Sequence, residues 1–140
     1  MSTSEFKTLQ RSYGFDEVAI VPGNVTINPE LTNTDFSIDN ITLSIPILAA
    51  AMDAVVSPEF AVQMHNMGGL AVMNLEGVQS KYDNPSEILA TIANTPQEKV
   101  AEVLQKIYAA PIRDDLIEAR ITKIKQSGAK CAISITPTNT

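Results

Sequence analysis

The chain has 140 residues and a net charge of −6, with 44% apolar and 19% charged residues, which is the balance of one modest globular domain rather than a disordered segment. The acidic balance, without any Lys/Arg-rich run, argues against nucleic acid and membrane surfaces as partners, and no apolar run approaches a membrane span. A single cysteine, Cys131, excludes an internal disulfide, and a single histidine, His65, makes a histidine-based zinc site implausible.

The predicted domain division begins with an N-terminal lead-in over residues 1–40, which is mostly polar. Residues 17–22 predict a short strand or extended segment, because they are apolar and end at a Pro-Gly pair. Residues 23–40 are rich in Asn, Thr, Asp and Pro, with brief extended pieces at 25–27 and 36–38. We expect an irregular lead-in or a hairpin that covers one end of the fold.

The second predicted part, residues 41–140, opens with two apolar runs at 45–52 and 70–75. Neither run alternates with period two, which is typical of parallel strands buried on both faces. Between them, Ser57 has the pattern of a helix N-cap before Pro58, and a Gly-Gly pair at 68–69 ends that helix. The pattern predicts strand, helix, strand.

Two further helices are predicted from repeated capping patterns. Asn84-Pro-Ser-Glu and Thr95-Pro-Gln-Glu each place a cap, a proline and a glutamate at capping-box spacing. They predict helices at about 85–93 and 96–109.

The remaining sequence predicts one more helix and one more strand. Residues 114–127 carry their apolar side chains at helical spacing and end at Gly128, and residues 131–136 form a third apolar run. Strands that alternate with helices indicate an α/β fold with a parallel sheet. This order by itself is compatible with a barrel segment and with an open doubly wound sheet.

Candidate ligand-binding residues follow from the C-terminal ends of the predicted strands, where parallel α/β proteins hold ligands. Met52, followed by Asp53, can pack on a flat ring or, as an equal alternative, belong to the core. Asn74 and Thr136 end the next two strands, where each can bond a ligand or, as the favoured alternative, satisfy loop backbone.

No complete catalytic constellation is visible in the sequence. Cys131 begins a predicted buried strand, whereas a reactive thiolate is expected at a strand's C-terminal end or a helix N-terminus. His65 lies beside the apolar face of its helix without a visible partner residue. We expect structural roles for both.

Three segments of the chain carry a family resemblance, namely Gly14-Phe-Asp-Glu-Val-Ala-Ile-Val-Pro-Gly23, Ile45-Pro-Ile-Leu-Ala-Ala-Ala-Met-Asp-Ala-Val55 and Gly68-Gly-Leu-Ala-Val-Met-Asn-Leu75. Together they resemble the IMP dehydrogenase/GMP reductase family, and the resemblance spans about residues 13–138. Residues 74–77 and 106–112 are most similar to the short dehydrogenase paralogue of actinobacteria and cyanobacteria, which lacks CBS domains.

The resemblance implies a TIM (β/α)8 barrel, of which this chain supplies the lead-in and about the first three strands. It implies NAD-dependent oxidation of inosine monophosphate (IMP) to xanthosine monophosphate (XMP) in guanine nucleotide synthesis, through a cysteine thiolate that attacks C2 of the purine. By carry-over, Ala50 and Met52 contact the nucleotide, and Thr136 and Pro137 face the adenosine end of NAD. Asn74, where many members carry a histidine, is the third substrate-binding candidate.

The family's catalytic cysteine loop, phosphate loops and mobile flap all follow its third strand, so no catalytic residue is assigned in this chain. We therefore expect a truncated chain that is inert alone. The alternatives are a GMP reductase-type parent and a non-catalytic piece that binds a full-length relative. The family implies a cytoplasmic homo-oligomer, a tetramer.

Overall fold

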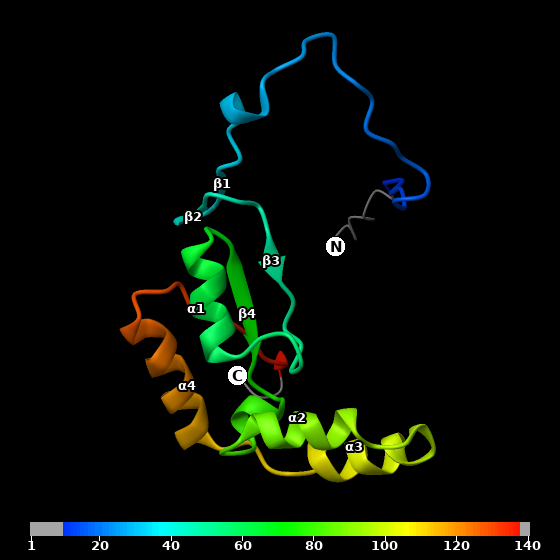
Figure 1. Cartoon of the computed structure of the whole chain (residues 1–140), viewed down its shortest axis with the longest axis vertical. Coiled ribbons are helices and arrows are strands. Elements are labelled where there is room, and N and C mark those ends of the chain that lie inside the picture. Colours follow the sequence, from blue (N-terminus) through cyan, green and yellow to red (C-terminus); the bar gives the residue numbers. More distant parts are fainter. Residues whose placement is uncertain (1–9, 138–140) are drawn as a thin grey trace, which may run out of the picture. The chain divides into compact units, whose positions relative to one another are not determined.

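The computed structural model describes residues 10–137, which divide into two compact units, one up to Asn33 and one from Thr34 onward (Figure 1). In the first unit the only regular element among the described residues is a 3-10 turn, η1 (Pro29–Leu31), which the Asn28 side chain caps. Residues 17–22 form no strand, so the strand alternative for this segment is wrong, and residues 25–27 form no regular element either. These segments have no neighbouring strand among the described residues, and a lone strand leaves its backbone groups unpaired.

The second unit begins with a small antiparallel hairpin. Strand β1 (Phe36–Ile38) pairs with β2 (Ile41–Leu43), and Asp39 adopts a positive φ of 50° in the turn. Asp is among the few residues that tolerate this conformation. A hairpin therefore forms, but it joins residues 36–38 of the predicted lead-in to residues 41–43 of the second predicted part, and it does not lie within residues 23–40 as expected.

A three-stranded parallel sheet forms the centre of the second unit. Strand β4 (Leu70–Asn74) lies between β3 (Leu48–Ala49) and β5 (Ala132–Ser134). Helix α1 (Pro58–Asn66) connects β3 to β4, and α4 (Asp114–Gln126) leads into β5. The α1 and α4 helices contact each other, and α1 packs on β4 (Figure 1). The predicted parallel α/β order is confirmed.

Only the central strand is buried as predicted. Residues along β4 are buried or half-buried, with Met73 1% exposed. The edge strands are shorter and more open than predicted, since Leu48 in β3 is 51% exposed and Ile133 in β5 is 46% exposed. An edge strand has one neighbour only, and helices α1 and α4 leave much of these two strands uncovered.

Helix α1 is positioned by the signals that its sequence carries. The Ser57 side chain accepts the Phe60 backbone N–H, Pro58 stands at the first helical position, and Gly68 follows the helix with φ of 90°. A Cβ atom on Gly68 would lie 1.8 Å from the Ser44 hydroxyl oxygen. A side chain is therefore excluded both by the backbone conformation and by space.

A helical hairpin stands between β4 and α4. It consists of α2 (Pro85–Ala93), the 3-10 turn η3 (Gln97–Lys99) and α3 (Val100–Tyr108), and a second 3-10 turn, η2 (Val78–Ser80), leads into it. Helix α2 has the predicted bounds, but the helix predicted at 96–109 is split, because its first turn has 3-10 geometry. Neither Asn84 nor Thr95 caps its helix with a side-chain hydrogen bond.

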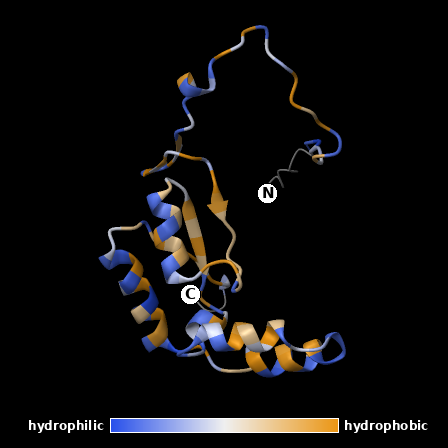
Figure 2. Cartoon of the chain, viewed as in Figure 1, coloured by the Kyte–Doolittle hydropathy of each residue, from blue (hydrophilic) through white to orange (hydrophobic). Residues whose placement is uncertain are grey.

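The core lies where α1 and α4 cover the sheet. Leu116 and Ile124 of α4 and Ala61 and Met64 of α1 are buried. A fully buried aliphatic side chain such as Ile124, which is 1% exposed, contributes about 1.5–3 kcal/mol. In Figure 2, orange apolar segments run along β4 and along the α2–α3 hairpin. Among residues 10–137, no helix is long and apolar enough to span a bilayer.

Candidate functional site

A cavity of about 360 Å³ opens at the C-terminal ends of β3 and β4, beside the helical hairpin. The strand ends contribute Met52, Asp53 and Asn74 to its wall. The hairpin contributes an apolar wall formed by Leu89, Ile92, Leu104 and Tyr108. The cavity thus combines an apolar surface with a few polar groups, which is the usual composition of a small-molecule site.

Asp53 is the polar centre of this cavity. It is 9% exposed, and its carboxylate accepts hydrogen bonds from the Asn74 side-chain amide at 3.0 Å, the Val78 backbone N–H at 3.1 Å and the Tyr108 hydroxyl at 2.6 Å. A buried carboxylate requires such donors, because its desolvation is otherwise unfavourable. Asp53 therefore joins the end of β3 to the end of β4 and to α3.

Gly77 permits the carboxylate to lie so close to the backbone. A Cβ atom at this position would lie 1.7 Å from one Asp53 carboxylate oxygen and 2.2 Å from its carboxyl carbon. No L side chain fits in that space. The backbone of the loop after β4 is thus shaped around Asp53.

Met52 lines the cavity with an exposed side chain. It is 58% exposed, and its carbonyl oxygen accepts the N–H groups of Val55 and Val56, both at 2.9 Å. The backbone is therefore fixed while the thioether stays accessible. Met52 therefore does not belong to the core, and its contact with a ligand stays a prediction.

Asn74 reaches the same cavity, but its side chain is engaged within the protein. Its amide donates to Asp53, and its side-chain oxygen accepts the Glu76 N–H at 3.0 Å. This is the favoured alternative of the sequence, in which Asn74 satisfies the loop. Asn74 holds Asp53 and the turn in place, and a contact with a ligand stays a prediction.

Thr136 is tied to the neighbouring strand end. Its hydroxyl and its N–H both donate to the same Glu76 carboxylate oxygen, at 2.6 and 3.2 Å. Thr136, Pro137 and Ala50 are exposed, and none of the three is in the wall of the 360 Å³ cavity. Sequence reasoning thus named two residues that the structure brings together in this cavity, Met52 and Asn74.

Tyr108 was missed by sequence reasoning. Burial, followed by the hydrogen bond to Asp53 and the negative charge of that carboxylate, raises the pKa of Tyr108 to about 12. The hydroxyl is therefore neutral and donating at physiological pH. Its partner is 55 residues away along the chain, so no local spacing pattern could have found the pair.

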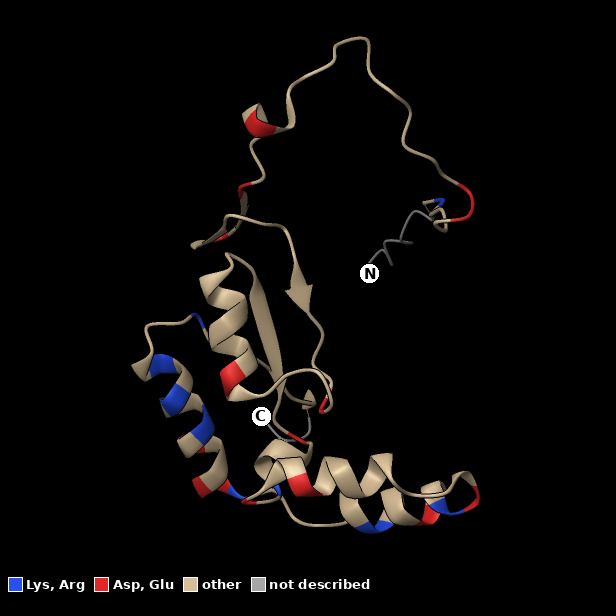
Figure 3. Ribbon diagram, in the orientation of Figure 1, with Lys and Arg blue, Asp and Glu red and all other residues tan. Residues whose placement is uncertain are grey.

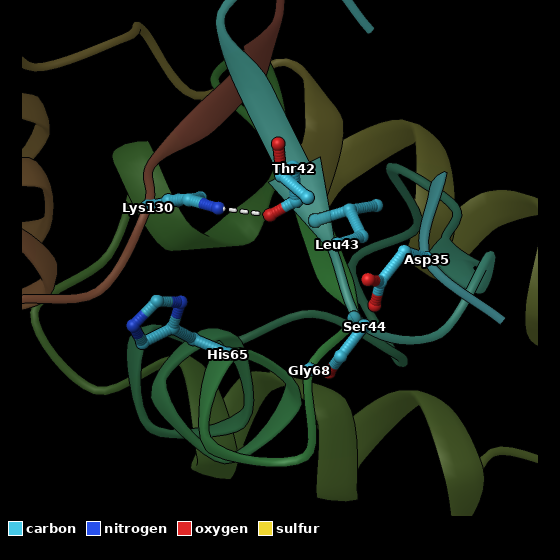
Figure 4. Close-up of a pocket in the computed structure, with 8 residues that line it drawn as sticks. Asp35, Thr42, Leu43, Ser44, His65, Gly68 and Lys130 are labelled. Atoms are coloured by element: carbon cyan, nitrogen blue, oxygen red, sulfur yellow. Dashed lines mark hydrogen bonds between the residues drawn. The ribbon is translucent and has the colours of Figure 1, made fainter. Parts of the chain in front are cut away.

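A second cavity, of about 280 Å³, lies at the opposite, N-terminal end of the sheet. Figure 4 shows His65 and Lys130 on one side of it and Asp35 and Ser44 on the other, with the Lys130 ammonium bonded to the Thr42 carbonyl. In parallel α/β barrels this end is associated with stability rather than chemistry. We therefore place the candidate site at the C-terminal end.

The single cysteine lies in an environment that disfavours a reactive thiolate. Cys131 lies at the N-terminal end of β5, and burial raises the pKa of its thiol despite the nearby Lys125 charge. A raised thiol pKa disfavours the thiolate that a nucleophile needs. Within residues 10–137 no group of three or more His, Cys, Asp or Glu side chains could hold a metal ion.

Comparison with known proteins is consistent across sequence and structure. The family model described as "IMP dehydrogenase / GMP reductase domain" matches residues 12–133. An uncharacterized oxidoreductase of Mycolicibacterium smegmatis is 34% identical over 138 residues, which cover 95% of this chain. An inosine-5'-monophosphate dehydrogenase of Streptococcus pyogenes is 30% identical over 139 residues, which cover 89% of this chain.

A solved structure agrees with the same fold. The crystal structure of an IMP dehydrogenase/GMP reductase-like protein from Corynebacterium glutamicum superposes with a TM-score of 0.84 at 29% identity over 94% of this chain. The chain spans 37% of the mycobacterial relative, 28% of the streptococcal one and 36% of the solved one. The parallel strands β3, β4 and β5 are thus part of a TIM-barrel fold, as the family resemblance implied.

Proposed function

Because the chain belongs to the IMP dehydrogenase/GMP reductase family, we propose that it contributes to the nucleotide site of an NAD-dependent oxidoreductase that converts IMP to XMP. The observation that carries the proposal is the family match over residues 12–133 together with an accessible Met52 at the C-terminal strand ends. The activity belongs to these residues joined to the rest of the barrel. In this reaction water supplies the new oxygen at C2, and NAD receives the hydride.

In the proposal, Met52 packs against the flat purine base and Ala50 lies beside the nucleotide. Thioether–ring contacts are favourable, and the exposed Met52 side chain is free to make one. Asp53 is a positioning residue that keeps the Met52 turn and the β4 end in one arrangement through its three hydrogen bonds. It does not itself need to contact the substrate.

For NAD we propose contacts with Thr136 and Pro137, which are exposed at the end of β5. The residues fit a dinucleotide in that the Pro137 ring offers an apolar surface and Glu76 beside Thr136 offers a carboxylate acceptor for hydroxyl groups. The cofactor would supply the hydride acceptor, which no protein side chain can replace. Cys131 is not proposed as the nucleophile, because burial raises its thiol pKa and it lies at the N-terminal end of β5.

The test is an assay of the natural protein that carries residues 84–127, captured from its own cells with an antibody against that segment. The proposal predicts NADH production that requires both IMP and NAD, with stoichiometric XMP. The isolated 140-residue chain should show none. NADPH oxidation with GMP in place of that activity would reassign the protein to the GMP reductase branch, and no activity with either pair would contradict the proposal.

The resemblance also leads us to propose that the active protein is a cytoplasmic homo-oligomer, a tetramer. Sedimentation of the captured protein tests the tetramer, and fractionation of the cells tests the cytoplasmic location. A catalytically active monomer would contradict it.

A further inference from the structure

A third, smaller cavity shares no lining residue with the strand-end cavity. Its volume is about 140 Å³, and it lies among the start of α1, the start of α2, the η2 turn and the middle of α4. Figure 1 shows the beginning of α2 near the lower part of α1 and near α4, and Figure 3 shows basic residues along α4. The polar side chains in its wall include Gln79, Ser86, Arg120 and Glu59.

Gln79 is an exception among the buried polar residues. It is 4% exposed, yet its side-chain amide makes no hydrogen bond with any other residue in the described part of the chain. No fully buried side-chain nitrogen or oxygen in that part lacks a partner. The amide must therefore reach the accessible surface, and the open space that Gln79 lines is this cavity. A ligand that enters the cavity can therefore accept hydrogen bonds from this amide in place of water.

The start of α2 offers backbone donors to the same space. Helix α1 is capped by Ser57, whereas no side chain caps α2, because Asn84 makes no such bond. The first N–H groups of a helix have no partner within the helix, and they carry the positive end of its dipole. Ser86, at the second position of α2, lines the cavity and adds a hydroxyl.

Arg120 supplies a cation, and one nitrogen of its guanidinium group has no hydrogen-bond partner in the described part of the chain. Its Nε donates to the Gln79 carbonyl at 3.3 Å, and its Nη2 donates to the carbonyls of Tyr82 at 3.3 Å and Asp83 at 3.0 Å. The third nitrogen, Nη1, makes no hydrogen bond with the described part of the chain. The guanidinium is thus fixed in place and keeps donors to spare.

The acidic side chains around the cavity already have positive partners, with one exception. Glu59 forms an ion pair with Lys123, and Asp83 pairs with Arg113 at 2.6 Å. The exception is Glu87, which lies in the first turn of α2 and is exposed. Glu87 does not line the cavity, so the uncompensated groups in its wall are the Arg120 cation and the neutral donors of Gln79 and Ser86.

We propose that this cavity binds a small tetrahedral oxyanion, phosphate, through the Gln79 amide, the Arg120 Nη1 group and the first turn of α2 at Ser86. A cavity of about 140 Å³ has room for several water molecules, and therefore for an anion of four oxygens. Charge-assisted bonds from a guanidinium and a helix N-terminus are the donors such anions prefer. The inference is independent of the proposed oxidoreductase activity, because the two cavities share no residue.

The test is an NMR titration of the ¹⁵N-labelled 140-residue chain with inorganic phosphate, at constant ionic strength maintained with chloride. We expect saturable shifts of the Gln79 side-chain amide and of the Ser86 and Glu87 backbone amides. Gln79→Leu should weaken phosphate binding about tenfold or more, because a bond to a charged group is lost. The matched control is Gln105→Leu, which changes an exposed glutamine on α3 and should bind phosphate like the wild type.

A second variant keeps the test decisive if Gln79→Leu folds poorly. Ser86→Asp places a carboxylate at the start of α2, where it favours the helix and repels phosphate. We expect phosphate to raise the melting temperature of the wild type. The Ser86→Asp variant should unfold at the same or a higher temperature than the wild type without phosphate, and phosphate should not raise its melting temperature. Equal responses to phosphate and chloride in the wild type, or wild-type affinity in Gln79→Leu and Ser86→Asp, would overturn the proposal.

Discussion

The Tyr108 hydroxyl donates a 2.6 Å hydrogen bond to the Asp53 carboxylate, and 55 residues of chain separate the two. Tyr108 ends α3, and Asp53 follows β3, so the bond fixes the helical hairpin against the C-terminal end of the sheet. The apolar wall of the strand-end cavity depends on this attachment. Changes to the bond, or to the groups around it, should therefore alter the stability of this end of the unit.

Replacing Tyr108 with Phe removes the hydroxyl and keeps the ring. One hydrogen bond to a carboxylate is lost, so we expect a loss of about 1–2 kcal/mol in the free energy of unfolding. Urea denaturation of the two proteins at neutral pH measures it. Equal midpoints would mean that the bond contributes nothing to stability.

The same pair predicts a stability change at high pH. The folded-state pKa of Tyr108, about 12, lies above its ordinary value of 10.0, so the folded protein holds the phenolic proton more tightly. The stabilisation is complete below pH 10 and is lost as the pH rises toward 12. Unfolding of wild type and Tyr108→Phe should therefore converge over this range. A constant difference between them across it would contradict the assigned pKa.

Asp53→Asn keeps the shape of the side chain but replaces one acceptor oxygen with a donor. Three groups donate to Asp53, and the amide cannot accept from all of them, so we expect a loss of about 2–3 kcal/mol. The measurement is again urea denaturation. Asp16→Asn is the control, because Asp16 is exposed and its substitution should change stability by less than about 0.5 kcal/mol.

Gly77→Ala should disturb the same network from the backbone side. The added methyl group would overlap the Asp53 carboxylate, at 1.7 Å, and must displace it, which we expect to cost about 1–3 kcal/mol. Gly23→Ala is the matched control, since nothing lies within 4 Å of a Cβ there. Similar melting temperatures for both variants would show that the close approach at Gly77 is unimportant.

The ion pair between Glu59 and Lys123 predicts acid behaviour. The hydrogen bond to Lys123 is the main cause that lowers the pKa of Glu59 from 4.5 to about 2, so its contribution is present above pH 4.5 and is lost as the pH falls toward 2. Both side chains are more than half exposed, and solvent screening limits the effect to about 1 kcal/mol or less. Lys123→Met should flatten this part of the stability profile, and an unchanged slope would contradict the pairing.

Local patterns predicted much of the fold. Ser57, Pro58 and Gly68 carry their own capping and turn chemistry, so the position of α1 follows from a few neighbouring residues. Two features were not predictable in this way: the division of the predicted helix at 96–109 into η3 and α3, and the absence of a capping bond from Asn84. Whether a capping side chain makes its bond depends on the surrounding contacts, which spacing does not encode.

The candidate site was predictable only in part. Met52 and Asn74 were found because strand ends in parallel sheets meet at one edge, which is a topological rule. Asp53 was noted beside Met52, but its role depends on donors 21, 25 and 55 residues away. The hairpin wall and Tyr108 needed the three-dimensional arrangement, because nothing in the sequence of α3 distinguishes a tyrosine that faces a carboxylate.

The proposed function depends above all on a contact between Met52, at the strand end, and the purine nucleotide. The measurement that tests this contact is the KM for IMP of the natural protein, compared with that of its Met52→Ala and Met67→Ala variants. Met67 is the matched control, because the two methionines are 58% and 59% exposed and Met67 follows α1 at the other end of the sheet. We predict a rise in KM of about tenfold for Met52→Ala, from the lost apolar contact, and no change for Met67→Ala. Equal KM values for Met52→Ala and the wild type would contradict the contact.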